Sequence, residues 1–287
     1  MNKTTLLKSI GLLPHPGHSG LRLIGLVSLL LGSAHALAQS TTLDLLPSQD
    51  NTLYERVAGD VSNGAGQWLF FGRTGPNNNM LLRRALMAFD LSAIPPGSEV
   101  LDASLSITVD MVPPMPTGFD ATLHRLTTAW GEGPSVAPGV GGSGGPAAIG
   151  DATWLHTFFD TDLWSTAGGD FAAQPSATTA IGAGVGTFTF AATPELIADI
   201  QAWVNQPASN FGWIILGEEN NPQNARRIHS RESTGGNPPL LSIEFIPRLL
   251  PPAVAVPALG PGGLTGLILC LFAGAGLLFQ RRRSITS

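Results

Sequence analysis

The chain has 287 residues and a formal net charge of −5, and its only cysteine is Cys270. Residues 39–247 hold eight arginines, no lysine and all 20 acidic residues, a net charge of −12. A region this acidic repels nucleic acid and anionic lipid, which excludes both as expected partners, whereas cations and neutral or cationic ligands stay compatible. With no disulfide available in residues 39–247, stability must come from a hydrophobic core or from bound ions.

The first 38 residues have the layout of a signal peptide. Lys3, Lys8 and Arg22 precede an uncharged apolar run at 23–31, and Ala36-Leu37-Ala38 follows, with small residues at 36 and 38. Because a permanent membrane helix needs about 20 apolar residues, this run favours cleavage after Ala38 over an uncleaved anchor. We therefore expect residues 1–38 to be removed and the mature protein to begin at Gln39.

The C-terminal end has the layout of a membrane anchor. Residues 262–279 are uncharged, and three arginines follow at 281–283. The positive-inside tendency places these arginines in the cytoplasm and residues 39–247 outside it. A buried core helix is the alternative, which the glycines and the basic stop disfavour. We expect a transmembrane helix over residues 262–283, preceded by a proline-rich spacer at 248–261.

A short proline motif, an apolar span and a terminal arginine cluster together resemble the C-terminal sorting signals that exosortase-type membrane proteases read. The motif here runs from Val256 to Pro261 and is similar to the variant that begins Ile/Val-Pro-Thr-Leu, with Ala258 in place of the usual Thr. The resemblance to these IPTL/PEP-CTERM signals implies an exosortase-type protease as a partner. It also implies a location in the cell envelope or outside the cell, with transient or permanent anchoring in the inner membrane.

The middle of the chain predicts an all-β domain. Apolar residues alternate with Ser and Thr from Glu99 to Val109, which is typical of a half-buried antiparallel strand. Gly, Pro and Asn clusters separate further short strands, which favours a sandwich or a jelly roll. We expect these further strands at 52–57, 68–72, 84–90, 121–126, 187–191, 213–217, 226–230 and 240–245.

Two other segments stand apart from the strands. Thr193 is a good N-cap, Pro194 and Glu195 suit a first helical turn, and apolar residues follow on one face, which predicts a single helix of about eleven residues. Residues 131–150 are rich in glycine without phosphate-loop spacing, which favours a flexible loop.

Several short motifs, in order and spacing, resemble the DNRLRE family of extracellular β-sandwich modules. The resemblance covers residues 47 to about 246. The family is similar to carbohydrate-binding modules, so the resemblance implies a non-catalytic binding or adhesive role. The motifs are DNTLYE at 50–55, RALMAFDL at 84–91, AWGEG at 129–133, NFGW at 210–213 and SRES at 230–233.

Oxygen-donating side chains beside turn glycines suggest a calcium site, because Ca²⁺ prefers carboxylate and amide oxygens. The alternative is that these side chains bond nearby backbone in turns, and a dedicated D-x-D-x-D-G calcium loop is absent. Glu55 and Glu232 can instead pair with arginines, which we favour for Glu232. The candidate calcium ligands are Asp50, Asn51, Glu55, Asn63 and Asp90.

Tryptophan faces can stack on sugar rings. Trp203 and Trp213 lie on apolar faces and are expected in the core. Trp130 and Trp164, flanked by glycine and acidic residues, are the candidate surface platforms for a polysaccharide ligand.

The sequence offers little for catalysis. It contains no H-E-x-x-H motif, and the neighbours Glu218 and Glu219 would point to opposite faces of a strand. We expect a non-enzymatic module of the envelope or matrix that binds carbohydrate or serves in adhesion. The alternatives are a purely structural surface protein and a polysaccharide-active enzyme.

Overall fold

The computed structural model describes residues 39–248. The expected signal peptide, the sorting motif and the expected transmembrane segment lie outside the described residues. Within 39–248, no helix is both long and apolar enough to cross a bilayer.

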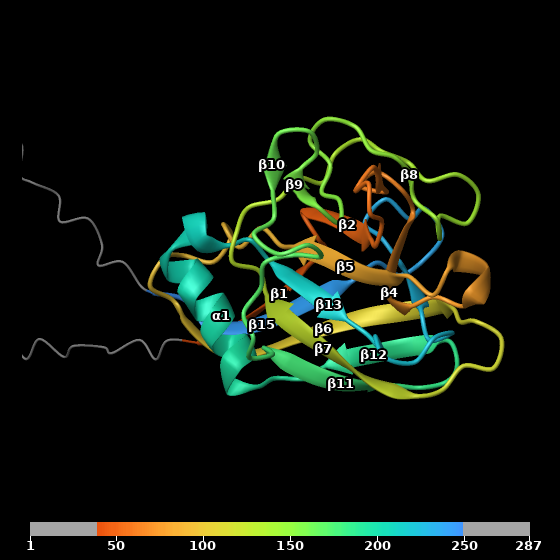
Figure 1. Cartoon of the computed structure of the whole chain (residues 1–287). Helices are drawn as coiled ribbons and strands as arrows, with labels where there is room; N and C mark the ends of the chain where they lie inside the picture. Colours follow the sequence, from red (N-terminus) through yellow and green to blue (C-terminus); the bar gives the residue numbers. More distant parts are fainter. Residues whose placement is uncertain (1–38, 249–287) are drawn as a thin grey trace, which may run out of the picture. The chain divides into compact units, whose positions relative to one another are not determined.

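The described chain is mostly β, with a curled antiparallel sheet and one short α-helix, α1 (Pro194–Asn205) (Figure 1). One half of the sheet consists of β1 (Thr41–Leu45), β15 (Leu240–Ile246), β6 (Glu99–Met111), β14 (Arg226–His229), β4 (Trp68–Arg73) and β12 (Gly186–Phe190). The other half consists of β2 (Gln49–Tyr54), β5 (Leu82–Ala88), β13 (Trp213–Leu216), β7 (Phe119–Arg125) and β11 (Ala177–Ile181). Two-stranded ladders join β3 (Val61–Ser62) to β8 (Gly145–Pro146) and β9 (His156–Phe158) to β10 (Asp162–Leu163), and 3-10 turns lie at η1 (Pro76–Asn78) and η2 (Pro207–Ser209).

The long strand β6 organises the first half of the sheet. It pairs with β12 along one edge, and with β15 and β14 in succession along the other. Its residues alternate as the sequence predicts, since Ala103, Leu105, Ile107 and Val109 are buried. All nine strand segments expected from the sequence are present within a few residues, whereas β1, β11 and the short ladders are additional.

Strand β4 connects the two halves. Residues 68–71 pair with β14, whereas Gly72 and Arg73 pair with β5. Gly72 has φ +100°, and a Cβ atom there would lie 2.8 Å from the Asn224 carbonyl oxygen. A residue without a side chain is therefore needed where the strand changes partner.

The main core lies between the two halves of the sheet. Leu105 and Ile107 of β6, Trp213 and Ile215 of β13, and Trp203 of α1 belong to one buried cluster. The rings of Trp203 and Trp213 meet edge to face, with their centroids 4.4 Å apart. The expectation that both tryptophans are core residues is confirmed, with exposures of 2% and 0%.

Helix α1 forms where the sequence predicts it. The Thr193 hydroxyl accepts a hydrogen bond from the Leu196 backbone N–H, and Pro194 opens the first turn. The helix lies over one end of the sheet, between β12 and β13 in the chain (Figure 1). Its buried side chains Leu196, Ile200, Trp203 and Val204 pack into the main core.

A second core lies on the outer face of the second half of the sheet. Leu53, Leu86 and Ile214 contribute from the strands, and the long connection between β7 and β11 covers them with aromatic side chains. The glycine-rich segment 131–150 belongs to this connection and is held against the sheet, because Tyr54 Oη donates to the Gly141 carbonyl at 2.9 Å. The domain therefore has a third layer, built of loops.

Replacing Gly72 should test the connection between the two halves of the sheet. We expect Gly72→Ala to lower the free energy of unfolding by about 1–3 kcal/mol, because alanine at φ +100° is strained and its Cβ meets backbone. Denaturant unfolding of the full chain in detergent would measure the change. Gly184→Ala is the matched control, since a Cβ there meets no heavy atom within 4 Å and the change should stay within about 0.5 kcal/mol. Equal losses in both variants would contradict the assignment.

Candidate functional site

The five candidate calcium ligands do not form one group. Asp50 and Asn51 lie at the start of β2 and Asn63 follows β3, and all three are buried. Glu55 lies beyond the far end of β2, where its carboxylate accepts a hydrogen bond from the Leu82 N–H at 2.6 Å. Asp90 is exposed and accepts from the Ser92 N–H at 2.9 Å. A single calcium site made of these five side chains is therefore wrong.

Asn51 and Asn63 join the strands to the loop layer. The Asn51 amide donates to Ser62 Oγ at 2.9 Å and to the Glu132 carbonyl at 2.7 Å, while its oxygen accepts from the Asn63 N–H. The Asn63 oxygen accepts from the Ala137 N–H at 2.7 Å. Because N–H donors already point at both amide oxygens, these side chains serve the structure, as the alternative reading of the sequence proposes.

Asp50 is different because one of its oxygens has no partner. Its Oδ2 accepts from the Arg231 N–H at 2.7 Å, whereas Oδ1 is buried without a hydrogen bond. One carboxylate oxygen each from Asp50, Glu132 and Glu232 lie within 4.8 Å of one another. We call these three residues the acidic cluster.

One arginine, Arg231, contacts the acidic cluster. Its Nε and Nη2 donate to the two Glu132 oxygens at 2.6 and 2.7 Å, and its Nε lies 2.8 Å from a Glu232 oxygen. The expected pairing of Glu232 with an arginine is thus confirmed. The other Glu232 oxygen, Oε2, is buried and has no hydrogen-bond partner.

The electrostatics of the cluster follow from burial and from the proximity of like charges. Burial raises the pKa of Asp50 well above its ordinary value, and the Glu232 and Glu132 carboxylates add to the rise. Burial likewise raises the pKa of Glu232, against the attraction of Arg231. The hydrogen bond to Glu132 raises the pKa of the Arg231 guanidinium, which therefore stays charged.

The candidate sugar platforms, Trp130 and Trp164, are buried. They are 3% and 5% exposed and belong to the second core. Their indole N–H groups donate to the Phe211 and Thr153 carbonyls at 2.8 and 2.9 Å. The expectation of surface exposure is wrong, because the loop connection around them forms a core of its own.

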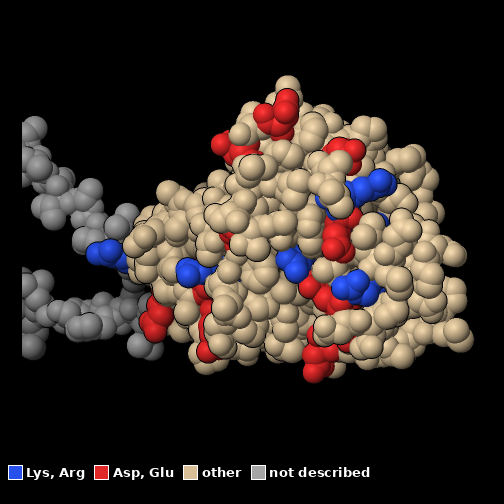
Figure 2. Space-filling view, viewed as in Figure 1, with Lys and Arg blue, Asp and Glu red and all other residues tan. Residues whose placement is uncertain are grey.

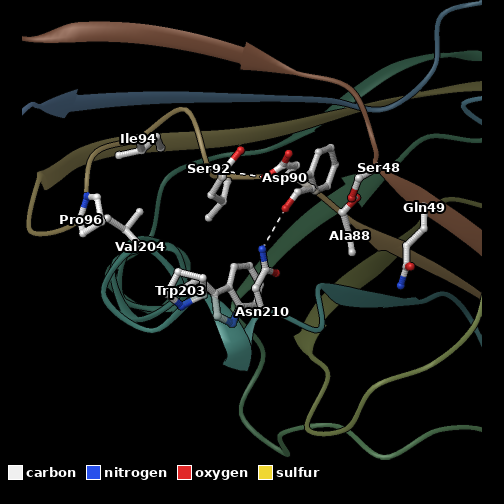
Figure 3. Close-up of a pocket in the computed structure, with 13 residues that line it drawn as sticks. Ser48, Gln49, Ala88, Asp90, Ser92, Ile94, Pro96, Trp203, Val204 and Asn210 are labelled. Carbon is white, nitrogen blue, oxygen red and sulfur yellow. Dashed lines mark hydrogen bonds between the residues drawn. The ribbon is translucent and has the colours of Figure 1, made fainter.

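A cleft opens between α1 and the connection from β5 to β6 (Figure 3). Its volume is about 580 Å³, and apolar side chains including Trp203, Val204 and Ile94 form its floor. Ser48, Gln49, Asp90, Ser92 and Asn210 supply polar groups around it. We call this cavity the helix cleft.

Asp90 is the charged group of the helix cleft. Hydrogen bonds from the Ser92 backbone and side chain lower the pKa of Asp90, so this exposed carboxylate is ionised at neutral pH. The Asn210 amide donates to the Phe89 carbonyl at 2.8 Å, which fixes the opposite side of the cleft (Figure 3). The cleft thus combines an apolar floor with hydrogen-bond acceptors and donors at its edge.

A second hollow, more open and more polar, lies over the loop layer. It has a volume of about 780 Å³ and is lined by Thr127, Ser165, Thr166, Asp170 and Arg84. The Arg84 guanidinium is already bound by Glu219 at 2.8 and 2.9 Å and by the Gly168 carbonyl. We call this hollow the polar groove.

Charged side chains are sparse on the face shown in Figure 2. Most of that face is neither acidic nor basic, and most of the basic groups visible on it lie near acidic ones (Figure 2). Three ion pairs of the described residues are Arg84–Glu219, Arg227–Asp110 and Arg231–Glu132. Pairing leaves acidic groups in excess over the described residues, as the sequence requires.

Comparison of the chain with known protein families and with curated proteins gives no match. The resemblance to DNRLRE modules and to exosortase sorting signals accordingly stays a prediction from sequence.

Removing the Asn51 amide should loosen the loop layer. We expect Asn51→Ala to lower the free energy of unfolding by about 2–4 kcal/mol, because Ser62, the Asn63 N–H and the Glu132 carbonyl lose buried partners. Urea unfolding of the full chain would measure the loss. Asp90→Asn serves as control, since the exposed side chain keeps an acceptor oxygen for Ser92 and should change stability by less than about 0.5 kcal/mol. An unchanged midpoint for Asn51→Ala would show that the loops are held without this amide.

Proposed function

We propose that the protein is an exported, non-catalytic module of the cell envelope or extracellular matrix that binds a glycan through the helix cleft. In this proposal residues 39–247 form a jelly-roll-like sandwich of the DNRLRE type. The observation that carries the proposal is the helix cleft, in which apolar side chains adjoin the polar groups of Gln49, Asp90 and Ser92 at the edge.

The composition of the helix cleft suits a sugar. A pyranose presents apolar C–H groups on its faces and hydroxyls at its rim, and these match an apolar floor bordered by Asp90, Ser92 and Gln49. The volume of about 580 Å³ lies within the range of roughly 300–1,000 Å³ that small-molecule sites occupy. The ionised Asp90 carboxylate accepts hydrogen bonds from hydroxyls, which makes it the group we expect to orient the ligand.

The charge of the domain favours a neutral or cationic glycan. Residues 39–247 carry a net charge of −12, and the one charged residue of the helix cleft is an acid. An acidic polysaccharide would meet repulsion on approach.

The geometry of the acidic groups supports a non-catalytic role. Asp50 of the acidic cluster is fully buried, so a glycosidic oxygen cannot reach it. Glu218 and Glu219 do not converge, because Glu218 accepts from the Asn220 and Asn221 N–H groups while Glu219 pairs with Arg84. Neither Glu218 with Glu219 nor a pair that includes the buried Asp50 therefore offers two accessible, converging carboxylates for a polysaccharide-active enzyme.

Export and anchoring rest on the two chain ends. The signal-peptide layout at 1–38 and the sorting-signal layout at 256–283 together support delivery across the inner membrane, anchoring there, and processing by an exosortase-type protease. In this proposal the domain acts on the outer side of that membrane.

Filling the helix cleft should weaken glycan binding. We expect the full chain in detergent to bind neutral or cationic glycans on an array, and Ser92→Trp to weaken binding by about tenfold or more, because the exposed Ser92 lines the cleft. Ser165→Trp is the matched control, since the exposed Ser165 lines the polar groove instead.

Three results would count against this proposal. Loss of binding in Ser165→Trp alone would move the site to the polar groove. Absence of binding to every glycan would favour the purely structural alternative, and release of reducing ends from a polysaccharide would indicate an enzyme.

Deleting the C-terminal segment tests the anchoring. Without residues 262–287, the protein should move from the membrane fraction to the soluble periplasmic or secreted fraction, because the apolar span and its arginines are gone. Cell fractionation followed by mass spectrometry measures this and also reads the N-terminus, expected at Gln39. An unchanged distribution would rule out the tail as an anchor.

A further inference from the structure

We propose that the acidic cluster of Asp50, Glu132 and Glu232 binds a hard divalent cation, for which calcium is the first probe. This site differs from the calcium site expected from the sequence, with which it shares only Asp50. None of the three residues lines the helix cleft, so the cation proposal does not depend on the proposed glycan binding and is tested separately from it.

The first argument is the unpartnered oxygen of a buried carboxylate. Asp50 has 0% exposure, its Oδ1 has no hydrogen bond, and Oε2 of Glu232 is also buried without a partner. A buried charged oxygen without a partner is costly unless a donor or a metal ion satisfies it. A cation bound by the acidic cluster would supply the missing positive partner for these carboxylates.

The second argument is distance. One oxygen from each of the three carboxylates lies within 4.8 Å of the others. Two ligands of one calcium ion, each 2.3–2.6 Å from it, lie at most about 5 Å apart. The three carboxylates are thus close enough to share one ion, with no large rearrangement of the strand β2 or of the segment after β14.

The third argument is charge. Three ionised carboxylates and the one guanidinium of Arg231 leave two negative charges, which a divalent cation neutralises. Arg231 holds both Glu132 oxygens and one Glu232 oxygen, so it positions these carboxylates while the free Glu232 oxygen and Asp50 Oδ1 remain available. Hard cations such as Ca²⁺ and Mg²⁺ prefer such oxygen ligands, and Ca²⁺ tolerates irregular geometry better than Mg²⁺ does.

The cation would also connect distant parts of the chain. Asp50 opens β2, Glu132 lies in the loop layer, and Glu232 follows β14 of the other half of the sheet. A ligand that binds only the folded state raises stability, and here it would fasten three segments that are far apart in sequence.

The test is thermal unfolding of the full chain in detergent, first stripped with chelator and then measured in calcium, in magnesium and in chelator at matched ionic strength. Calcium at 100 times its dissociation constant should raise the melting temperature by roughly 5–10 °C over chelator. Calorimetric titration of calcium into the stripped protein gives the affinity independently.

The variants decide whether the acidic cluster is responsible. Asp50→Asn and Glu232→Gln keep the side-chain shape and should each remove most of the calcium-dependent rise, whereas Asp90→Asn, an exposed acid of the helix cleft, should keep it. For each variant the melting temperature in calcium is compared with that in chelator, so a general loss of stability does not hide the effect of calcium. The second substitution keeps the test valid if one of the two variants fails to fold.

Two outcomes would overturn the proposal. Identical midpoints in calcium and chelator, with no heat of titration, would mean that no cation binds and that the buried carboxyl groups hold protons instead. A calcium-dependent rise of the same size in all three variants would be general screening of the acidic surface. Glycan binding by the helix cleft is measured separately, and neither outcome affects it.

Discussion

The buried amide of Asn51 is central to the attachment of the loop layer to the sheet. The connection between β7 and β11 holds only short ladders of regular structure, yet it covers the outer face of the second half of the sheet. Asn51 fixes it by donating to the Glu132 carbonyl and to Ser62 while accepting from the Asn63 N–H. A buried polar group without a partner raises the free energy of the folded state. Loop arrangements that bury the same apolar area but leave these polar groups unpaired are therefore less stable than the observed one.

The same amide determines where the acidic cluster forms. Asn51 holds the backbone of Glu132, and the Glu132 side chain accepts from the Asp50 N–H at 2.8 Å, so the strand and the loop are joined twice within two residues. Arg231 then brings the segment after β14 to the same place. The acidic cluster therefore follows from how the loop layer is joined to the sheet, and none of its three residues lines the helix cleft.

Local patterns in the sequence predict the strands and the helix well. Alternation over residues 99–109 and the Thr193 cap with its apolar face depend only on near neighbours. Strand β1 is harder to predict because it is a short edge strand in which only Leu43 and Leu45 are half-buried. Strand β11 is harder to predict because Thr178, Thr179 and Ala180 give a weak pattern. The observed strand ends differ by a few residues from the expected ones. Each strand ends where its pairing partner ends, and the sequence alone does not reveal the partners.

The functional candidates were harder to predict because they depend on contacts between distant segments. Glycine and acidic neighbours suggested that Trp130 and Trp164 are exposed, yet the aromatic side chains of the connection pack together as a second core. Asp50 was identified from its turn context, whereas its neighbours Glu132 and Glu232 lie 82 and 182 positions further along the chain. The motifs AWGEG and SRES contain both residues, but their convergence appears only when the sheet is formed.

The position of β15 determines how the domain would respond to mechanical load. This last strand lies between β1 and β6, with Thr41 opposite Phe245 on one side and Leu105 opposite Leu241 on the other. Tension that enters the fold through Arg248 therefore pulls on an interior strand, and along its axis it shears two ladders of hydrogen bonds together instead of peeling one open. If force is applied from the C-terminal side, the hydrogen bonds along the whole of β15 oppose the removal of this strand from the sheet. Part of that resistance comes from its pairing with β1, the first strand of the domain.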